Sequence, residues 1–333
     1  MTIHPDLSPE SPQAASPGSG IHCLLLYYTG TFNTRYITQK VKLRLEEEGC
    51  RVTTYEIDPM SNEPLDYSPY NLIGFGSPIY GFAAPYAFLR FIRAQKFPAG
   101  LRGFIYKNSG ETYHANDASS KYFLRKLRRD GASVQNEYHF MMPYNIHFRF
   151  EDACIREMLE MDKKLLEIMV YEVLHGIPNW KPYKLWPRFV ASMVARPQYI
   201  GGPVNSFLYK VDKDKCTNCN LCIKRCPVQN IYRNKKGEIA FHHRCLMCMR
   251  CSFYCPADAF DIGFLEDWGW HVNIRGGYNF KRIEQMPLTP FITPETKGFF
   301  KCYIEKFATI NRRYAELFGD KPVVNKNWCY TEE

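Results

Sequence analysis

Hydrophobic residues in the first half of the chain recur as short continuous runs separated by amphipathic stretches. The run at 21–28 (IHCLLLYY) is almost wholly apolar, which is typical of a strand buried on both faces. Similar runs predict strands at 51–57, 72–76, 103–106 and 133–142. Between them, apolar residues at helical spacing predict helices, one with Ile37, Val41 and Leu45 on one face and others at 85–95 and 116–130. Strands alternating with helices predict an α/β fold with a doubly wound, parallel, five-stranded sheet.

Polar loops follow three of the predicted strands, at the edge where such sheets bind ligands. The first loop consists of Thr29, Gly30, Thr31, Phe32, Asn33 and Thr34. Its hydroxyl groups and the N-terminus of the following helix suit a phosphate group. The loop has neither the lysine of a nucleotide P-loop nor the pattern G-x-G-x-x-G, so a dinucleotide site is disfavoured. The other two loops contain Pro78, Ile79, Tyr80, Gly81 and Phe82, and then Asn108, Ser109 and Gly110.

Residues 21–145 resemble the flavodoxins, whose phosphate loop reads roughly Thr/Ser-x-Thr-Gly-Asn-Thr. Thr31, Asn33 and Thr34 match that motif, whereas Phe32 stands where the family has glycine. The resemblance implies an FMN cofactor with its phosphate on Thr29–Thr34. It also implies a flavin ring beside Tyr80 and Phe82 and a third flavin loop at 108–110. Phe32 either points away from the phosphate or weakens the site, because glycine lets the backbone approach closely.

Residues 216–256 contain one cysteine pattern twice, with the first copy beginning at Cys216 and the second at Cys245. Each copy reads C-x2-C-x2-C-x3-C-P, the run found in bacterial ferredoxins with two [4Fe–4S] clusters. In such proteins the fourth cysteine of each run ligates the other cluster. We therefore expect one cluster on Cys216, Cys219, Cys222 and Cys255, and a second on Cys245, Cys248, Cys251 and Cys226.

Structural zinc is the main alternative for these cysteines, since paired C-x2-C units also bind zinc. A tetrahedral zinc site would need only two such pairs and would leave the third cysteine and the Cys-Pro unexplained. A disulfide framework is less favoured still, because the sequence shows no secretory signal.

The remaining segments carry no chemical motif. Residues 1–20 are rich in Pro, Ser and Gly and are expected to be disordered. Residues 151–175 predict a long helix, and 176–203 an aromatic connector pinned to both neighbours. The expected organisation is a tail at 1–20, a flavodoxin-like domain at 21–150, a helix and connector at 151–204, a bacterial-type α+β dicluster ferredoxin domain at 205–265, and a C-terminal extension at 266–333. We expect the extension to pack over the ferredoxin domain.

Composition and charge narrow the setting. The 333 residues include 13 cysteines, which fits a reducing compartment such as the cytoplasm. The net charge of +9 comes without any base-stacking motif, so an acidic partner protein is favoured over nucleic acid. No apolar run is long enough to cross a bilayer. Trp186 and Phe189 lie beside Lys184 and Arg188 and could touch a membrane surface, but peripheral membrane contact is not expected. The sequence leaves the oligomeric state open.

A flavodoxin-like domain followed by a dicluster ferredoxin domain resembles a family of flavodoxin–ferredoxin fusion proteins. The resemblance implies electron transfer between FMN, two [4Fe–4S] clusters and a redox partner. Lys213, Lys215, Lys224 and Arg225 are candidates for docking an acidic partner. An alternative is an FMN-dependent reductase of a quinone- or tetrapyrrole-like molecule, although no catalytic acid or base stands out. A redox sensor is the third hypothesis and has no visible output domain.

Overall fold

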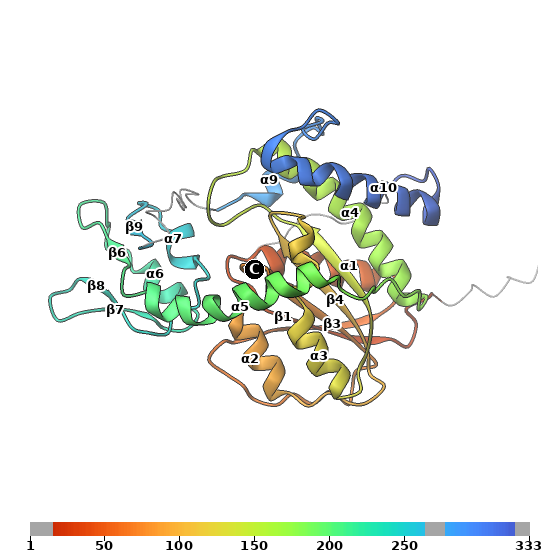
Figure 1. Ribbon diagram of the computed structural model, residues 1–333, viewed down its shortest axis with the longest axis horizontal. Coiled ribbons are helices and arrows are strands. Elements are labelled where there is room, and N and C mark those ends of the chain that lie inside the picture. The colour runs from red at the N-terminus through yellow and green to blue at the C-terminus, as the bar shows by residue number, and fades with distance from the viewer. Residues whose placement is uncertain (1–15, 264–276, 324–333) are drawn as a thin grey trace, which may run out of the picture.

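The computed structural model describes residues 16–263 and 277–323, without the side chains of 194–196 and 198–199. Residues 1–15 of the expected tail lie outside the described residues, as do 264–276 and 324–333. Figure 1 shows a parallel sheet with helices on both faces, a smaller segment at one end, and the C-terminal helices beside α4.

The sheet consists of five parallel strands in the order β2-β1-β3-β4-β5. This is the flavodoxin-like order, in which the direction of strand addition reverses between β1 and β3. The strands are β1 (His22–Tyr27), β2 (Arg51–Glu56), β3 (Leu72–Pro78), β4 (Arg102–Ser109) and β5 (Ser133–Met141). β3 is buried throughout, because helices cover both faces of the sheet. The predicted α/β fold is therefore confirmed.

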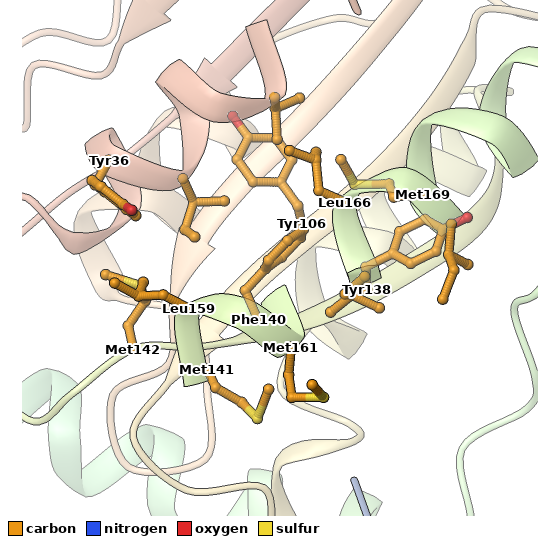
Figure 2. Close-up of a cluster of buried hydrophobic side chains, with 14 of the residues drawn as sticks. Tyr36, Tyr106, Tyr138, Phe140, Met141, Met142, Leu159, Met161, Leu166 and Met169 are labelled. Carbon is orange, nitrogen blue, oxygen red and sulfur yellow. The ribbon is translucent and has the colours of Figure 1, made fainter. Parts of the chain in front are cut away.

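Two hydrophobic cores lie on opposite faces of the sheet. One core packs under α2 (Tyr86–Ala94) and α3 (Lys121–Arg129). The other packs under α1 (Asn33–Glu47) and α4 (Asp152–Leu174). Figure 2 shows this second core, where side chains of α4 meet those of β5. The labelled residues are Tyr36, Tyr106, Tyr138, Phe140, Met141, Met142, Leu159, Met161, Leu166 and Met169.

The segment expected to be an aromatic connector forms a helix, α5 (Leu185–Asn205). Pro187 lies in its first turn, where a missing N–H is tolerated. Pro197 and Pro203 lie within it, which is why the residue pattern here carries little sign of a helix. The ammonium group of Lys121 donates to the carbonyl of Arg188 at 2.7 Å. This bond attaches α5 to the part of the molecule that contains the five-stranded sheet, which we call the sheet half.

The cysteine-rich segment is small and built from short elements. Two antiparallel pairs join β6 (Lys210–Val211) to β9 (Phe260–Asp261) and β7 (Ile231–Arg233) to β8 (Ile239–Phe241). The cysteine turns begin two short helices, α6 (Leu221–Arg225) and α7 (Arg250–Phe253). Such a small segment has few apolar residues with which to form a core of its own.

The C-terminal extension contains α9 (Phe280–Glu284), the 3-10 turn η2 (Gly298–Lys301) and α10 (Cys302–Phe318). Glu284 accepts a hydrogen bond from the hydroxyl of Tyr36 at 2.5 Å and forms an ion pair with Lys40 at 3.0 Å. α10 packs along α4, where Arg313 pairs with Glu172 at 2.8 Å. The expectation that the extension covers the ferredoxin segment is therefore wrong for α9 and α10. Their apolar faces complete the core of the sheet half instead.

Candidate functional site: two cysteine cavities against a phosphate-type loop

The two cysteine turns repeat each other in backbone conformation. Three non-glycine residues in each copy adopt positive φ, and they occupy equivalent positions of the two copies. The pairs are Asn218 and Met247, Asn220 and Met249, and Gln229 and Asp258, with φ between 48° and 60°. Left-handed residues between cysteines curl the chain so that several thiols face one point. The sequence repeat is therefore also a structural repeat.

Eight thiols surround two cavities. Cys216, Cys219, Cys222 and Cys255 line the first, and Cys226, Cys245, Cys248 and Cys251 line the second. The fourth cysteine of each run thus lies with the first three of the other run. Within the described ranges, no three His, Cys, Asp or Glu side chains gather as the ligands of a single ion do.

Backbone donors and apolar side chains complete both cavities. The N–H of Asn230 points to the sulfur of Cys226 at 3.1 Å, and that of Ala259 to the sulfur of Cys255 at 3.4 Å. Val211 and Phe260 line the first cavity, and Ile231 lines the second. N–H donors stabilise thiolate charge, and apolar walls limit water.

The loop 29–34 leads directly into α1 and leaves that helix without a side-chain cap. Phe32 is the residue before α1 and has φ 71°, the left-handed conformation that glycine adopts easily. The first N–H groups of a helix have no partner inside it, so they are available to an anion. The hydroxyl oxygen of Thr29 is buried and has no hydrogen-bond partner in the described part of the chain. A buried hydroxyl of this kind is costly unless a ligand satisfies it.

The other hydroxyls and the amide of the loop are held by neighbouring segments. Thr34 donates to the side chain of Asn108 at 2.8 Å. The hydroxyl of Thr31 accepts from Asn145 at 3.0 Å, and Asn33 donates to the carbonyl of Pro143 at 2.9 Å. The chain after β5 therefore braces the outer side of the loop.

The loop after β3 is a tight turn beside the first loop. The backbone of Tyr80 exchanges hydrogen bonds with Ala83, while Gly81 and Phe82 have φ of 49° and 63°. Pro78 ends β3 in register with Asn108, and Ile79 donates to the carbonyl of Asn108 at 2.9 Å. The hydroxyl of Tyr80 is buried without a partner in the described residues, and it lies so close to Gly30 that a Cβ there would meet it at 1.9 Å. Burial raises the pKa of Tyr80 above its usual range.

The loop after β4 is interior. Ser109 lies 2.7 Å from the ring nitrogen of His139. A Cβ on Gly110 would lie 2.3 Å from the ring of Tyr144, and the Gly110 carbonyl accepts from the hydroxyl of Tyr303. Residues 108–110 therefore contact the first two loops through Asn108. Tyr144 and Tyr303, from segments further along the chain, cover Gly110.

The second cysteine turn rests directly on the first loop. The guanidinium of Arg250 donates to the carbonyls of Gly30 at 2.5 Å and Thr29 at 2.8 Å. The hydroxyl of Tyr254 donates to the carbonyl of Thr31 at 3.1 Å. These donors engage carbonyls and leave the N–H groups of the loop uncovered by them.

Phe32 packs into the same contact. Its ring lies 5.6 Å from that of Tyr254, and the guanidinium of Arg250 lies over it at 4.7 Å. A Cβ on Gly30 would meet the carbonyl of Cys248 at 3.2 Å. Phe32 therefore takes a left-handed backbone conformation, which glycine adopts easily, and turns its ring to the cysteine-rich segment.

Arg250 and Tyr254 were missed in the sequence because nothing near them indicates a contact with so distant a part of the chain. A comparison of the two copies of the cysteine pattern does give a signal of this contact. The equivalent positions of the first copy are Leu221 and Arg225, so the two copies differ where only the second touches the sheet half.

A separate cavity of about 710 Å³ lies beside β4 and β5, lined among others by Lys107, His139 and Lys306. Lys107 pairs with Glu137 at 2.7 Å. Burial, with nearby Lys306 and Lys107, holds the pKa of His139 well below its usual range. Burial also lowers the pKa of Lys306 to about 8.

Comparison with known proteins agrees with the cysteine spacing. Residues 215–260 match the family model described as a 4Fe-4S dicluster domain. The search of curated proteins found no match to the chain.

Solved structures similar to the sheet half include two flavodoxins and a quinone reductase. A flavodoxin from Streptococcus pneumoniae TIGR4 and flavodoxin 2 from Bacillus cereus are each 18% identical, with a TM-score of 0.35; the match covers 46% of this chain and 99% of theirs. An NAD(P)H:quinone oxidoreductase from Methanothermobacter marburgensis is 12% identical, with a TM-score of 0.34, 49% of this chain and 100% of that chain being covered. By its strand order and its cysteine motif, the chain joins a flavodoxin-like α/β domain to a 4Fe-4S dicluster domain in a single polypeptide.

Proposed function

We propose that this protein transfers electrons between an FMN held by the sheet half, two [4Fe–4S] clusters held by the eight cysteines, and a separate redox protein. FMN exchanges electrons singly or in pairs, and each cluster exchanges one at a time. The observation that carries the proposal is the contact of Arg250 with Thr29 and Gly30. It joins a cysteine cavity to a phosphate-type loop within one molecule, so the two carriers need not find each other by diffusion.

The cysteine cavities fit the clusters proposed for them. Each has four thiols, a backbone N–H aimed at a sulfur and apolar walls. We assign Cys216, Cys219, Cys222 and Cys255 to one cluster and Cys226, Cys245, Cys248 and Cys251 to the other.

The loop 29–34 fits the phosphate of FMN. The hydroxyl of Thr29, unpartnered in the described chain, and the uncapped start of α1 supply donors for an anion. We assign the ring to the side of the turn 78–82, where Gly81 is exposed and Phe82 partly exposed. Residues 108–110 hold this arrangement from below, through Asn108 on Thr34.

The two cysteine cavities differ in their surroundings, and this suggests an order for the centres. The turn of Cys248 lies against the phosphate loop, whereas Cys219 of the other cavity is exposed. We therefore place the second cluster next to the flavin and the first next to the partner protein.

The surface near the first cavity offers a mixed set of charges to an acidic partner. Lys213 pairs with Glu238 at 2.5 Å, and Lys215 with Asp212 at 3.8 Å. Arg225 stacks over the ring of Tyr254 at 5.0 Å. All four candidates are exposed, and Lys224 is the one for which neither an ion pair nor a stacked ring is found among the described residues, so we expect it to contribute most to docking. The domain boundaries at 150, 204 and 265 and a reducing, cytoplasmic setting remain part of this proposal.

Anaerobic reconstitution tests the proposal. The full chain is loaded with iron, sulfide and FMN and then desalted. About eight iron, eight sulfide and one FMN are expected per chain, since two cubanes and one phosphate loop are proposed. Zinc without sulfide, or a protein that retains neither flavin nor iron, would exclude the proposed function.

A reductase of a small molecule is the second candidate, and one cavity favours it. A hollow of about 310 Å³ lies between the two halves and is lined by Cys245, Tyr80, Arg90 and Leu246. A ligand of quinone size in this hollow would lie against a cysteine turn. Steady turnover of a quinone by the loaded protein, with no partner protein present, would favour this candidate over the carrier.

A further inference from the structure

Helix α5 carries its large apolar side chains on the side away from the protein. These exposed residues, which include the turn after the helix, form what we call the α5 apolar face: Leu185, Trp186, Phe189, Met193, Ile200, Val204, Phe207 and Leu208. At about 100° per residue the six that belong to the helix fall within a sector of about 100°, and Phe207 and Leu208 follow in the turn after it. Trp186 is 66% exposed and Ile200 67% exposed. Because so much of this surface stays open to solvent, burial within the described chain does not explain why these positions are apolar.

The opposite side of α5 is the one that packs, and those of its residues whose side chains the structure describes are small or polar. Pro187, Ala191, Gly202, Asn205 and Ser206 are buried. A Cβ on Gly202 would meet the carbonyl of Cys245 at 2.5 Å, so the helix lies directly against the second cysteine turn. The usual arrangement, with apolar residues inward and polar residues outward, is therefore reversed.

Hydrogen bonds hold both ends of α5 to the rest of the protein. The outward orientation of its apolar side is therefore fixed by these contacts. Lys121 holds the first half through the carbonyl of Arg188. Asn205 donates to the carbonyl of Ile262 at 3.0 Å, and Ser206 to that of His242 at 3.0 Å. Figure 1 shows α5 lying lengthwise across the molecule, from the sheet half to the cysteine-rich segment.

The segment of chain that contains α5 carries formal charges of one sign. The segment 176–211 contains no Asp or Glu, and its basic residues are Lys181, Lys184, Arg188, Arg196 and Lys210. Lys181, Lys184, Arg188 and Lys210 are exposed. Exposed Trp and Phe beside Lys and Arg are the composition of helices that lie in the headgroup region of anionic membranes.

We propose that the protein docks on an anionic lipid surface through the α5 apolar face, with the flanking basic residues at the headgroups. The contact we propose is peripheral. No helix in the described ranges is long and apolar enough to cross a membrane. This proposal departs from the prediction made from the sequence, where Trp186 and Phe189 raised the possibility of such a contact but peripheral membrane contact was not expected. The structure adds the other members of the α5 apolar face to the same side of one helix.

Vesicle sedimentation with the full-length protein tests this inference independently of either cofactor. The protein should sediment with phosphatidylcholine vesicles containing about one third phosphatidylglycerol, and much less with phosphatidylcholine alone or at high salt. The triple change Trp186→Ser, Phe189→Ser and Ile200→Ser should reduce partitioning about tenfold or more, as should Lys184→Glu with Arg188→Glu. Matched controls remove exposed apolar or basic residues elsewhere and should bind normally: Leu43→Ser with Leu288→Ser, and Lys297→Glu with Lys301→Glu.

A second readout keeps the test valid if the triple variant folds poorly. Lipids brominated on their acyl chains should quench tryptophan fluorescence of the native protein, and Trp186→Phe should remove most of that quenching. Failure to bind anionic vesicles, or binding that survives both sets of changes on α5, overturns the proposal. A native dimer that the triple change converts to monomer, without any vesicle binding, would also overturn it and would assign the face to a second copy of the chain.

Discussion

Arg250 donates a hydrogen bond of 2.8 Å to the carbonyl of Thr29, linking the second cysteine turn to the loop 29–34 across 221 positions of sequence. The same guanidinium bonds Gly30 and covers the ring of Phe32. Because the donors take carbonyls, the amide side of the loop stays available for an anion. The contact therefore fixes the distance between the two halves without closing the proposed cofactor site.

Replacing Arg250 should weaken the contact between the second cysteine turn and the loop 29–34. Arg250→Ala removes two hydrogen bonds with a charged donor, each worth about 1.5–3 kcal/mol. We expect slower electron transfer between flavin and clusters with unchanged iron, sulfide and FMN contents. Stopped-flow absorbance measures the rate. Arg225→Ala is the control, because it leaves both Arg250 bonds in place; an equal effect of the two changes would refute a specific role for Arg250.

The buried hydroxyl of Thr29 gives a test of the phosphate site. Thr29→Val keeps the side-chain shape and removes an oxygen that has no partner in the described chain. The flavin-free protein should become more stable, whereas FMN affinity should fall by about 1.5–3 kcal/mol. Thermal unfolding with and without FMN measures both.

Thr38→Val is the matched control for that change. The hydroxyl of Thr38 is already bonded to the carbonyl of Thr34 and lies 3.0 Å from the hydroxyl of Tyr106. Its removal should destabilise the protein with little effect on FMN affinity. Equal behaviour of the two variants would argue against a phosphate at Thr29.

The crossing of cysteines between the two runs makes an unusual prediction about single substitutions. Cys255→Ala should damage the cluster on Cys216, Cys219 and Cys222, although Cys255 belongs to the other run. Cys226→Ala should damage the second cluster. Low-temperature electron paramagnetic resonance of the reduced variants distinguishes them. Loss of the cluster within the mutated residue's own run would disprove the assignment.

Lys306 should make stability depend on pH in the alkaline range. Burial lowers the pKa of Lys306 to about 8 from its usual 10.5, while Asp162 and Asp117 oppose the shift and Lys107 adds to it. Between those values the unfolded chain binds more protons than the folded one, so the free energy of unfolding should rise with pH. Below about pH 8 both forms are protonated and the full cost remains.

Lys306→Met tests this pH dependence. It should stabilise the protein near neutral pH by about 1–3 kcal/mol and flatten the rise above pH 8. Denaturant unfolding across the pH range measures it, with the exposed Lys301→Met as control. A variant with an unchanged slope would show that Lys306 does not cause it.

Some parts of this structure were predictable from the sequence and others were not. The strands were predictable because continuous apolar runs such as 21–28 are required of strands buried on both faces. The eight cysteines line two cavities in the grouping expected from ferredoxins that share their spacing. The helix α5 was not predictable, because Pro197 and Pro203 argue against a helix and packing overrides that preference.

Contacts between distant segments were the least predictable part. Tyr144, which covers Gly110, and Arg250, which holds Thr29, carry no local signal of their partners. The expectation that the extension covers the ferredoxin segment is wrong for α9 and α10, because the amphipathic helix α10 fits any apolar face and that face is supplied by α4. Phe32 was ambiguous in the sequence, and its orientation depends on Tyr254, which belongs to the other half of the molecule.

The most direct test of the central claim is electron transfer within a single molecule. In the reconstituted protein the flavin is reduced by a short light pulse, and cluster bleaching is followed by absorbance at several protein concentrations. The account predicts first-order bleaching with a rate constant that does not change with protein concentration and that falls in Arg250→Ala. A rate proportional to protein concentration, or no bleaching after flavin reduction, would contradict it.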